Sequence, residues 1–187
     1  MGSVLLRGER VVLRPWADAD LAPFAAMNAD PEVMRHMSAA LTRDESDAFA
    51  SRIRTHIAAH GFGLWAIDVP ELGFAGFVGL SPQVPFELAV PGVVSKPHEI
   101  GWRLARAAWG QGYATEGAEL ALSYGFDVLG LPQIVSFTAV GNTSSQAVMQ
   151  RIGLTRRGEF DHPRMPEGHR SRRQVLYAQD APSKATA

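Results

Sequence analysis

Two glycines, one residue apart, connect a predicted strand to a predicted helix near the middle of the chain. The strand covers residues 98–104, the glycines lie within Trp-Gly-Gln-Gly-Tyr-Ala-Thr-Glu at residues 109–116, and apolar spacing predicts a helix over residues 115–129. Glycine lets the backbone adopt φ > 0 or approach a ligand closely. The first N–H groups of a helix lack intrahelical acceptors, and with the helix dipole they favour an anion, most often a phosphate.

Two common nucleotide-binding formats do not fit this turn. The dinucleotide fingerprint G-x-G-x-x-G would need a third glycine where the chain has Thr115. The P-loop needs a Gly-Lys pair, and the sequence contains none. A lone pair of glycines is equally compatible with a tight connection that binds nothing, so the interpretation depends on the residues around it.

The stretch at residues 109–116 resembles the acyl-CoA signature (Q/R)-x-x-G-x-(G/A) of the GNAT acetyltransferase superfamily. Trp109 stands in the Gln/Arg position, Gly112 in the glycine position and Ala114 in the last. The tryptophan departs from the general pattern but is usual in the branch resembling ribosomal-protein alanine N-acetyltransferases. The resemblance implies that backbone amides of this turn bind the pyrophosphate of acetyl-CoA, and the residues it assigns here are Trp109, Gly110, Gln111, Gly112, Tyr113, Ala114 and Thr115.

A second, independent motif, Asn-x-x-Ser-x-x-Val-x-x-x-x-Gly-Leu, occupies residues 142–154. Asn142 is a good N-cap for the short helix predicted there. The resemblance implies that Asn142 also hydrogen-bonds the pantetheine arm, and that Ser145 lies near the sulfur and could protonate the departing thiolate. Many superfamily members use a tyrosine for that step, but the three tyrosines of this chain lie outside this helix: Tyr113, Tyr124 and Tyr177.

Acetyl transfer to an amine requires a base for the amine, a donor for the developing oxyanion and a proton for the thiolate. Glu99 is the candidate base, because relatives carry an acid in the same E-I-G-(Y/W) context; it would act directly or through a water. The alternative is a structural residue paired with Arg103, which shares its strand face. His98 is a weaker candidate, since strand alternation points it to the opposite face.

The end of this strand is the expected site for the pantetheine amides. The backbone of Leu104 could pair with them as an added strand pairs with an open sheet edge. The oxyanion donor would be a backbone N–H between Trp102 and Leu104, and the sequence does not choose among them.

The order of elements predicts a mixed α/β fold, a single domain over residues 1–180 with a flexible tail at 181–187. A helix is expected from Asp18, a further helical turn at residues 31–37, and an irregular loop at residues 81–97. The resemblance implies a GNAT-like sheet with helices on both faces. It further implies that the fourth and fifth strands, residues 98–104 and 134–140, splay apart to admit CoA.

Composition and charge limit the kinds of chemistry and binding partner that the chain can have. With 46% hydrophobic residues the chain can bury a substantial core, and the absence of cysteine excludes disulfides and thiolate chemistry. A formal charge of −1 argues against nucleic-acid or membrane partners, although a C-terminal arginine cluster would be the place for nucleic acid: Arg164, Arg170, Arg172 and Arg173. His162 and His169 are too widely spaced to predict a metal site. We expect a cytoplasmic protein without a signal peptide, and a homodimer if it assembles.

The function predicted from these residues is N-acetyl transfer from acetyl-CoA to a primary amine, directly within a ternary complex. The acceptor could be a protein N-terminus or a small-molecule amine. The alternative is a non-catalytic CoA-binding or regulatory module that keeps the phosphate turn but lacks a productive acceptor site.

Ligand-dependent thermal unfolding tests the phosphate turn. Acetyl-CoA and CoA should raise the unfolding temperature, and NAD should not, because a ligand that binds only the native state stabilises it by mass action. If millimolar acetyl-CoA leaves the unfolding temperature unchanged, the stretch at residues 109–116 is only a connection.

Overall fold

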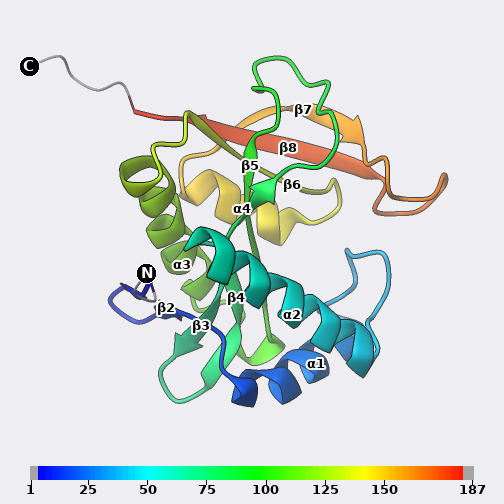
Figure 1. Ribbon diagram of the computed structural model, residues 1–187. Helices are drawn as coiled ribbons and strands as arrows, with labels where there is room; N and C mark the ends of the chain where they lie inside the picture. Colours follow the sequence, from blue (N-terminus) through cyan, green and yellow to red (C-terminus); the bar gives the residue numbers. More distant parts are fainter. Residues whose placement is uncertain (1–3, 183–187) are drawn as a thin grey trace, which may run out of the picture.

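One eight-stranded sheet, in the order β1-β2-β3-β4-β5-β6-β8-β7, organises the computed structural model, which describes residues 4–182 (Figure 1). Its strands are β1 (Leu6–Arg7), β2 (Val12–Arg14), β3 (Leu64–Val69), β4 (Gly73–Gln83), β5 (His98–Leu104), β6 (Gln133–Ala139), β7 (Thr155–Asp161) and β8 (Arg173–Asp180). The helical elements are η1 (Asp18–Asp20), α1 (Leu21–Ala29), α2 (Arg43–His60), η2 (Arg106–Ala108), α3 (Tyr113–Ser123), η3 (Tyr124–Val128) and α4 (Thr143–Arg151).

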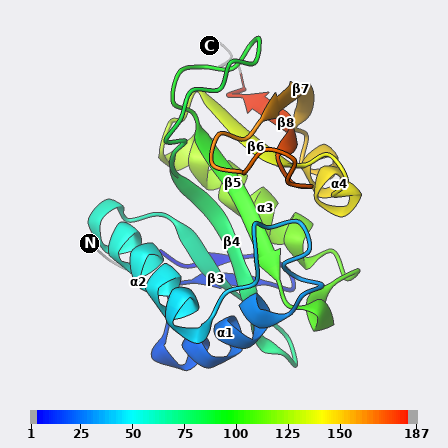
Figure 2. The same ribbon diagram turned by 90° about the vertical axis from the view of Figure 1, so that its right-hand side faces the viewer.

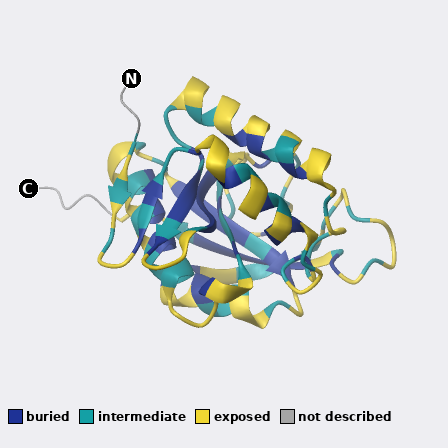
Figure 3. Cartoon of the chain, turned by 90° about the horizontal axis from the view of Figure 1, so that it is seen from below, coloured by how far each residue is buried: buried dark blue, intermediate teal, exposed yellow. Residues whose placement is uncertain are grey.

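Helices cover both faces of this sheet (Figures 1 and 2). α1 and α2 pack on one face through a cluster that includes Phe24 and Phe77, while α3 and α4 pack on the other through a cluster that includes Val78 and Ala118. Phe77 and Val78 are neighbours on β4, and strand alternation sends one side chain into each cluster. The strands are accordingly buried while the outer helix faces are exposed (Figure 3). The predicted α/β class, with helices on both faces, is confirmed.

The sheet opens between β5 and β6. This is its parallel pair, and only His98–Ile134 and Glu99–Val135 remain in register before the two seven-residue strands part. β5 meanwhile pairs with β4 along most of its length, and β6 pairs with β8 along all of its length. The predicted splay between the fourth and fifth strands is therefore present, and β5 presents backbone that β6 does not pair.

Local capping explains several element boundaries. Thr42 caps α2 in a reciprocal box with Glu45, and Gly61 ends the helix at φ 78°. The N-cap predicted at Asn142 is also present, with its side chain accepting from the backbone N–H of Ser145.

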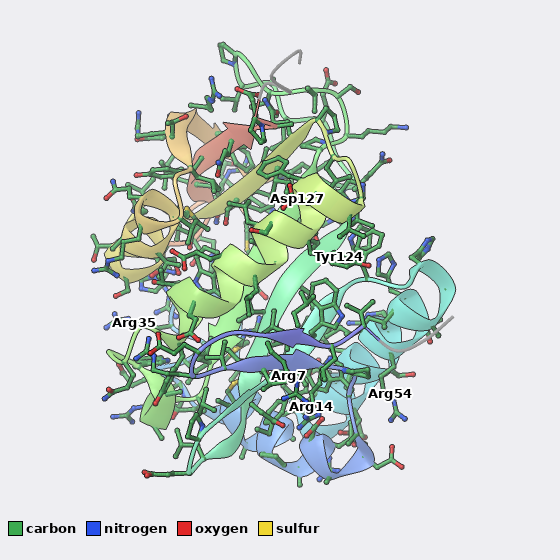
Figure 4. All side chains as sticks on the ribbon, turned by 90° about the vertical axis from the view of Figure 1, so that its left-hand side faces the viewer. Arg7, Arg14, Arg35, Arg54, Tyr124 and Asp127 are labelled. Atoms are coloured by element: carbon green, nitrogen blue, oxygen red, sulfur yellow. The ribbon has the colours of Figure 1, made fainter. Side chains whose placement is uncertain are left out.

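Two predicted helical segments differ from the structure. The further helical turn predicted at residues 31–37 is shorter than expected. Asp30 starts it, with its carboxylate accepting from the Glu32 N–H at 2.8 Å and its carbonyl from the Met34 N–H at 3.0 Å, and residues 37–39 form a bend. The helix predicted to reach residue 129 changes from α to π geometry at Tyr124, labelled in Figure 4. There Gly125 approaches the sheet so closely that a Cβ would lie 2.6 Å from Ile134.

Within residues 4–182, no helix combines the length and the apolar character that crossing a membrane requires. The predicted tail lies, beyond its first two residues, outside the described part of the chain. The predicted limits of the single domain, residues 1–180, stay a prediction.

Removing the α2 cap should destabilise the protein modestly. Replacing Thr42 by Ala deletes the acceptor of the Glu45 N–H, 3.2 Å away, and should lower the free energy of unfolding by about 1 kcal/mol. Urea unfolding would show a lower midpoint with an unchanged slope. Thr42→Ser keeps the acceptor and should behave as the parent; equal midpoints for Thr42→Ala and the parent would contradict the assignment.

Candidate active site

The glycine turn after β5 leaves its amides free for an anion. Gly110 and Gly112 have φ values of 75° and 83°, a left-handed geometry that glycine adopts without strain. Gly112 is the N-cap of α3, and the first backbone hydrogen bond runs from the Glu116 N–H to the Gly112 carbonyl at 3.1 Å. The N–H groups of residues 113–115 precede that ladder, and no side chain caps them. The turn thus has the geometry of an anion site at a helix N-terminus.

Arg10 braces this turn from the other end of the sequence. Its backbone N–H and Nε donate to the Glu116 carboxylate at 2.6 and 3.0 Å, and the Val11 N–H adds a bond at 3.2 Å. Its Nη1 donates to the Gln111 carbonyl at 2.9 Å, and its guanidinium lies 5.3 Å from the ring centre of Tyr113. Arg10 therefore fixes the turn and places a positive charge beside its amides, a role that the sequence analysis missed.

Trp109 links the turn to the end of β5. Its indole N–H donates to the Leu104 carbonyl at 2.8 Å, although the side chain is 46% exposed. One lone pair of that carbonyl is therefore taken before any ligand binds. Trp102 is half-buried and packs against the core beneath α3. The pantetheine pairing predicted for Leu104 and the oxyanion donor predicted between Trp102 and Leu104 consequently depend on backbone groups on the β6 side of β5.

Glu99 lies at the point where β5 and β6 part. It is the last β5 residue in register with β6, and Ile100 beside it points into the core under α3. By alternation, Glu99 faces the α1–α2 side of the sheet. The side chain is half-buried, and burial raises the pKa of its carboxyl to about 8. No hydrogen bond or ion pair of Glu99 occurs among residues 4–182, so desolvation acts without a compensating partner.

Neither neighbour considered at the sequence level engages Glu99. Arg103 faces the same side but donates to Asn28 Oδ1 at 2.6 Å, so the alternative ion pair with Glu99 is not formed. The ring of His98 lies 3.1 Å, through Nδ1, from the Ser81 carbonyl and packs edge-on against Phe62. Within the described residues, Glu99 is thus an unpaired carboxyl at the point where the sheet opens.

The N-terminus of α4 reaches back to β6. Asn142 donates through Nδ2 to Thr138 Oγ1 at 2.9 Å and to Ser145 Oγ at 3.0 Å. The Ser145 hydroxyl accepts this bond, so its own proton is left to donate elsewhere. Asn142 uses both amide hydrogens in this way, and only its oxygen, which already caps the helix, has a lone pair for a ligand.

Two other segments border the α1–α2 side. Of the irregular loop predicted at residues 81–97, residues 81–83 belong to β4 and residues 84–97 are irregular. Gln133 bonds to Gly92 and Val94 of this loop, and the loop residues Val84 and Val90 are buried. The hairpin between β7 and β8 carries the arginine cluster. There Arg173 pairs with Glu159 and Asp161, which neutralises part of the charge that a nucleic acid would need.

Replacing Glu116 by Gln should weaken the hydrogen bonds by which Arg10 and Val11 hold the glycine turn. The carboxylate accepts three hydrogen bonds from Arg10 and Val11, and bonds to a charged group contribute about 1.5–3 kcal/mol each, so the unfolding temperature should fall. The stabilisation by added acetyl-CoA should also shrink, because the turn loses its fixed position. Glu119→Gln, exposed on the same helix, is the control; identical behaviour of the two variants would contradict this role.

Comparisons of the sequence and the structure with known proteins all match acetyltransferases. Residues 10–155 match the acetyltransferase (GNAT) domain family. The FsC-acetyl coenzyme A-N(2)-transacetylase of Aspergillus fumigatus is 34% identical over 134 residues, which are 69% of this chain and 55% of that protein. The chain therefore spans about half the length of that relative.

Two solved structures share the fold. A GNAT-family acetyltransferase from Bacillus anthracis superposes with a TM-score of 0.76 at 23% identity, covering 95% of this chain and 99% of its own. RimL, a ribosomal L7/L12 α-N-protein acetyltransferase in complex with coenzyme A, superposes with a TM-score of 0.74 at 15% identity, covering 95% and 98%. With the family match over most of its length, this chain belongs to the GNAT acetyltransferase family, whose members are acetyl-CoA-dependent acyltransferases.

Proposed function

We propose that this protein transfers the acetyl group of acetyl-CoA directly to a primary amine, with Glu99 as the general base. The observation that carries the proposal is the Glu99 carboxyl, unpaired at the opening of the sheet, where burial raises its pKa to about 8. A base with a pKa near the working pH takes up a proton efficiently and is still ionised often enough to act.

In this proposal the amine loses its proton to the Glu99 carboxylate, directly or through a water, and its nitrogen attacks the thioester carbon. A backbone N–H of β5 between Trp102 and Leu104 donates to the developing oxyanion. The tetrahedral intermediate collapses, the C–S bond breaks, and the amide forms. Ser145 gives its proton to the thiolate and regains one from solvent, while Glu99 releases to solvent the proton taken from the amine. The role of Ser145 is supported by a hydroxyl that accepts from Asn142 and has its own proton to donate.

Acetyl-CoA would lie along the gap between β5 and β6. The amides of residues 111–115 would bind the pyrophosphate, with the Arg10 charge beside them. Asn142 would accept from a pantetheine N–H through its oxygen. We assign the whole activity to one domain over residues 1–180.

The acceptor class is an amine on a protein N-terminus or on a small molecule. Support comes from the relatives: RimL is described as acting on the α-amino group of a ribosomal protein, and the Aspergillus protein as an N(2)-transacetylase. A non-catalytic CoA-binding module remains the alternative function, and release of free CoA dependent on an added amine would exclude it.

Glu99→Gln should lower kcat/KM by about 10²–10⁴-fold at pH 8 while leaving CoA affinity unchanged. In the parent enzyme kcat/KM should rise as the pH passes through about 8, because the carboxyl must release its proton to act as a base. Glu99→Gln should lose this rise of kcat/KM near pH 8. Thiol release measured across pH 6–10 provides the profile.

The acceptor amine must also lose a proton, which gives its own rise of kcat/KM with pH. Measuring two acceptors whose amines have different pKa values separates the two effects, because only the rise caused by the substrate shifts between them. Glu87→Gln, exposed on the loop of residues 84–97, is the matched control and should keep the parent profile. An unchanged rate and profile in Glu99→Gln would refute the base assignment.

A further inference from the structure

Arg103 is a largely desolvated cation on the strand that carries Glu99. Its guanidinium carbon lies 5.8 and 5.5 Å from the ring centres of Phe49 and Phe77, so aromatic rings replace water around it. Burial lowers the pKa of Arg103 to about 10, which leaves it charged at neutral pH. A desolvated charge is costly unless an opposite charge accompanies it.

No carboxylate accompanies Arg103 within the described residues. The two acids of the neighbouring segment lie nearer to other arginines: Asp30 is 3.9 Å from Arg106, and Glu32 is 3.7 Å from Arg35. Arg35 itself extends to the molecular surface (Figure 4). The positive charge of Arg103 is therefore uncompensated within this part of the fold.

The hydrogen bonds of Arg103 are also incomplete on one side. Nη1 donates to Asn28 Oδ1 at 2.6 Å, and Asn28, fully buried, donates in turn to Ser46. Nη2 meets only the Met37 sulfur at 3.3 Å, a weak acceptor, and Nε is buried without a partner. Nε and Nη2 form one edge of the guanidinium, and this edge matches the two oxygens of a carboxylate.

This edge lies on the acceptor side of the proposed reaction. Arg103 and Glu99 share one face of β5, four residues apart, which corresponds to about 13 Å along a strand. Met37, which covers the edge, belongs to the segment between α1 and α2 that crosses beside β5 (Figure 2). Both Met37 and Arg103 are partly exposed, so a ligand that moves the thioether reaches the guanidinium.

We propose that Arg103 is a specificity residue that binds a carboxylate of the acceptor, placed on the order of 10 Å from the amine that Glu99 deprotonates. This inference rests on the proposed function. It selects acceptors that carry both an amine and a carboxylate at this separation, such as the two ends of a short extended peptide.

Equilibrium binding to the CoA-saturated protein tests the carboxylate site without turnover. The probes are Ala-Ala-Ala with a free C-terminal carboxylate and the same tripeptide with a C-terminal amide, measured by titration calorimetry. The free acid should bind about tenfold to a hundredfold more tightly, because a charge-assisted bidentate pair forms only with it. Arg103→Gln should remove this difference in affinity between acid and amide. Arg103→Lys keeps the positive charge but not the two parallel N–H donors of the guanidinium, and it should retain part of the difference.

Arg106→Gln is the matched control. It removes a positive charge three residues away, from an exposed side chain, and should preserve the preference for the acid. Thermal unfolding checks that each variant is folded. If Arg103→Gln does not fold, Arg103→Lys tests the inference in its place. Equal affinities for acid and amide, no binding of either, or a preference that survives Arg103→Gln would overturn the proposal.

Thiol release with acetyl-CoA and the same two peptides separates this inference from the proposed function. Equal acetylation of acid and amide would overturn the role of Arg103 and leave amine acetylation intact. Tight binding of the acid without acetylation of either peptide would refute the proposed function and leave the carboxylate site standing.

Discussion

The short parallel contact between β5 and β6 is the constraint on which the site depends. Two register pairs hold these strands together, after which β5 stays bound to β4 and β6 to β8 while the two diverge. Backbone N–H and C=O groups on the open sides have no strand partner, and such groups must be satisfied by solvent or a ligand. An extended, amide-bearing arm such as pantetheine meets that requirement in the way an added strand does. The gap in the sheet thus leaves backbone groups of β5 available to a ligand.

β5 carries opposite electrostatic features at its two ends. Beyond its carboxyl end, the turn at Gly110 and Gly112 offers free amides and the nearby Arg10 guanidinium, which favour an anion. Near its amino end, Glu99 lies in a desolvated position that favours the neutral acid. Antiparallel pairing with β4 fixes the register of β5, and the bond from the Trp109 indole to the Leu104 carbonyl ties the turn to the end of the strand, so both set the spacing between these features. A substrate with a charged diphosphate at one end and a neutral thioester at the other suits such a polarity.

The elements that the sequence predicted well are those with local causes. The bounds of β5, the Asn142 cap and the glycine turn each depend on residues within a few positions of one another. The helical turn predicted at residues 31–37 likewise begins for a local reason, the bond from the Glu32 N–H to the Asp30 side chain. The brace between Arg10 and Glu116 spans 106 residues, and the bond between Arg103 and Asn28 spans 75, so periodicity and motif spacing carried no signal for either.

The sequence by itself determined the family resemblance, the glycine turn at the start of α3 and the Asn142 cap, because glycine geometry and helix-end hydrogen bonding are properties of short segments. It also excluded cysteine chemistry. Only the tertiary structure decided that Glu99 stands unpaired with a raised pKa, and that Arg103 turns toward Asn28 and Met37 instead of toward Glu99. Protonation and ion pairing depend on how much water is excluded and on which charges come near. Both are set by segments far apart in the chain that the fold brings together.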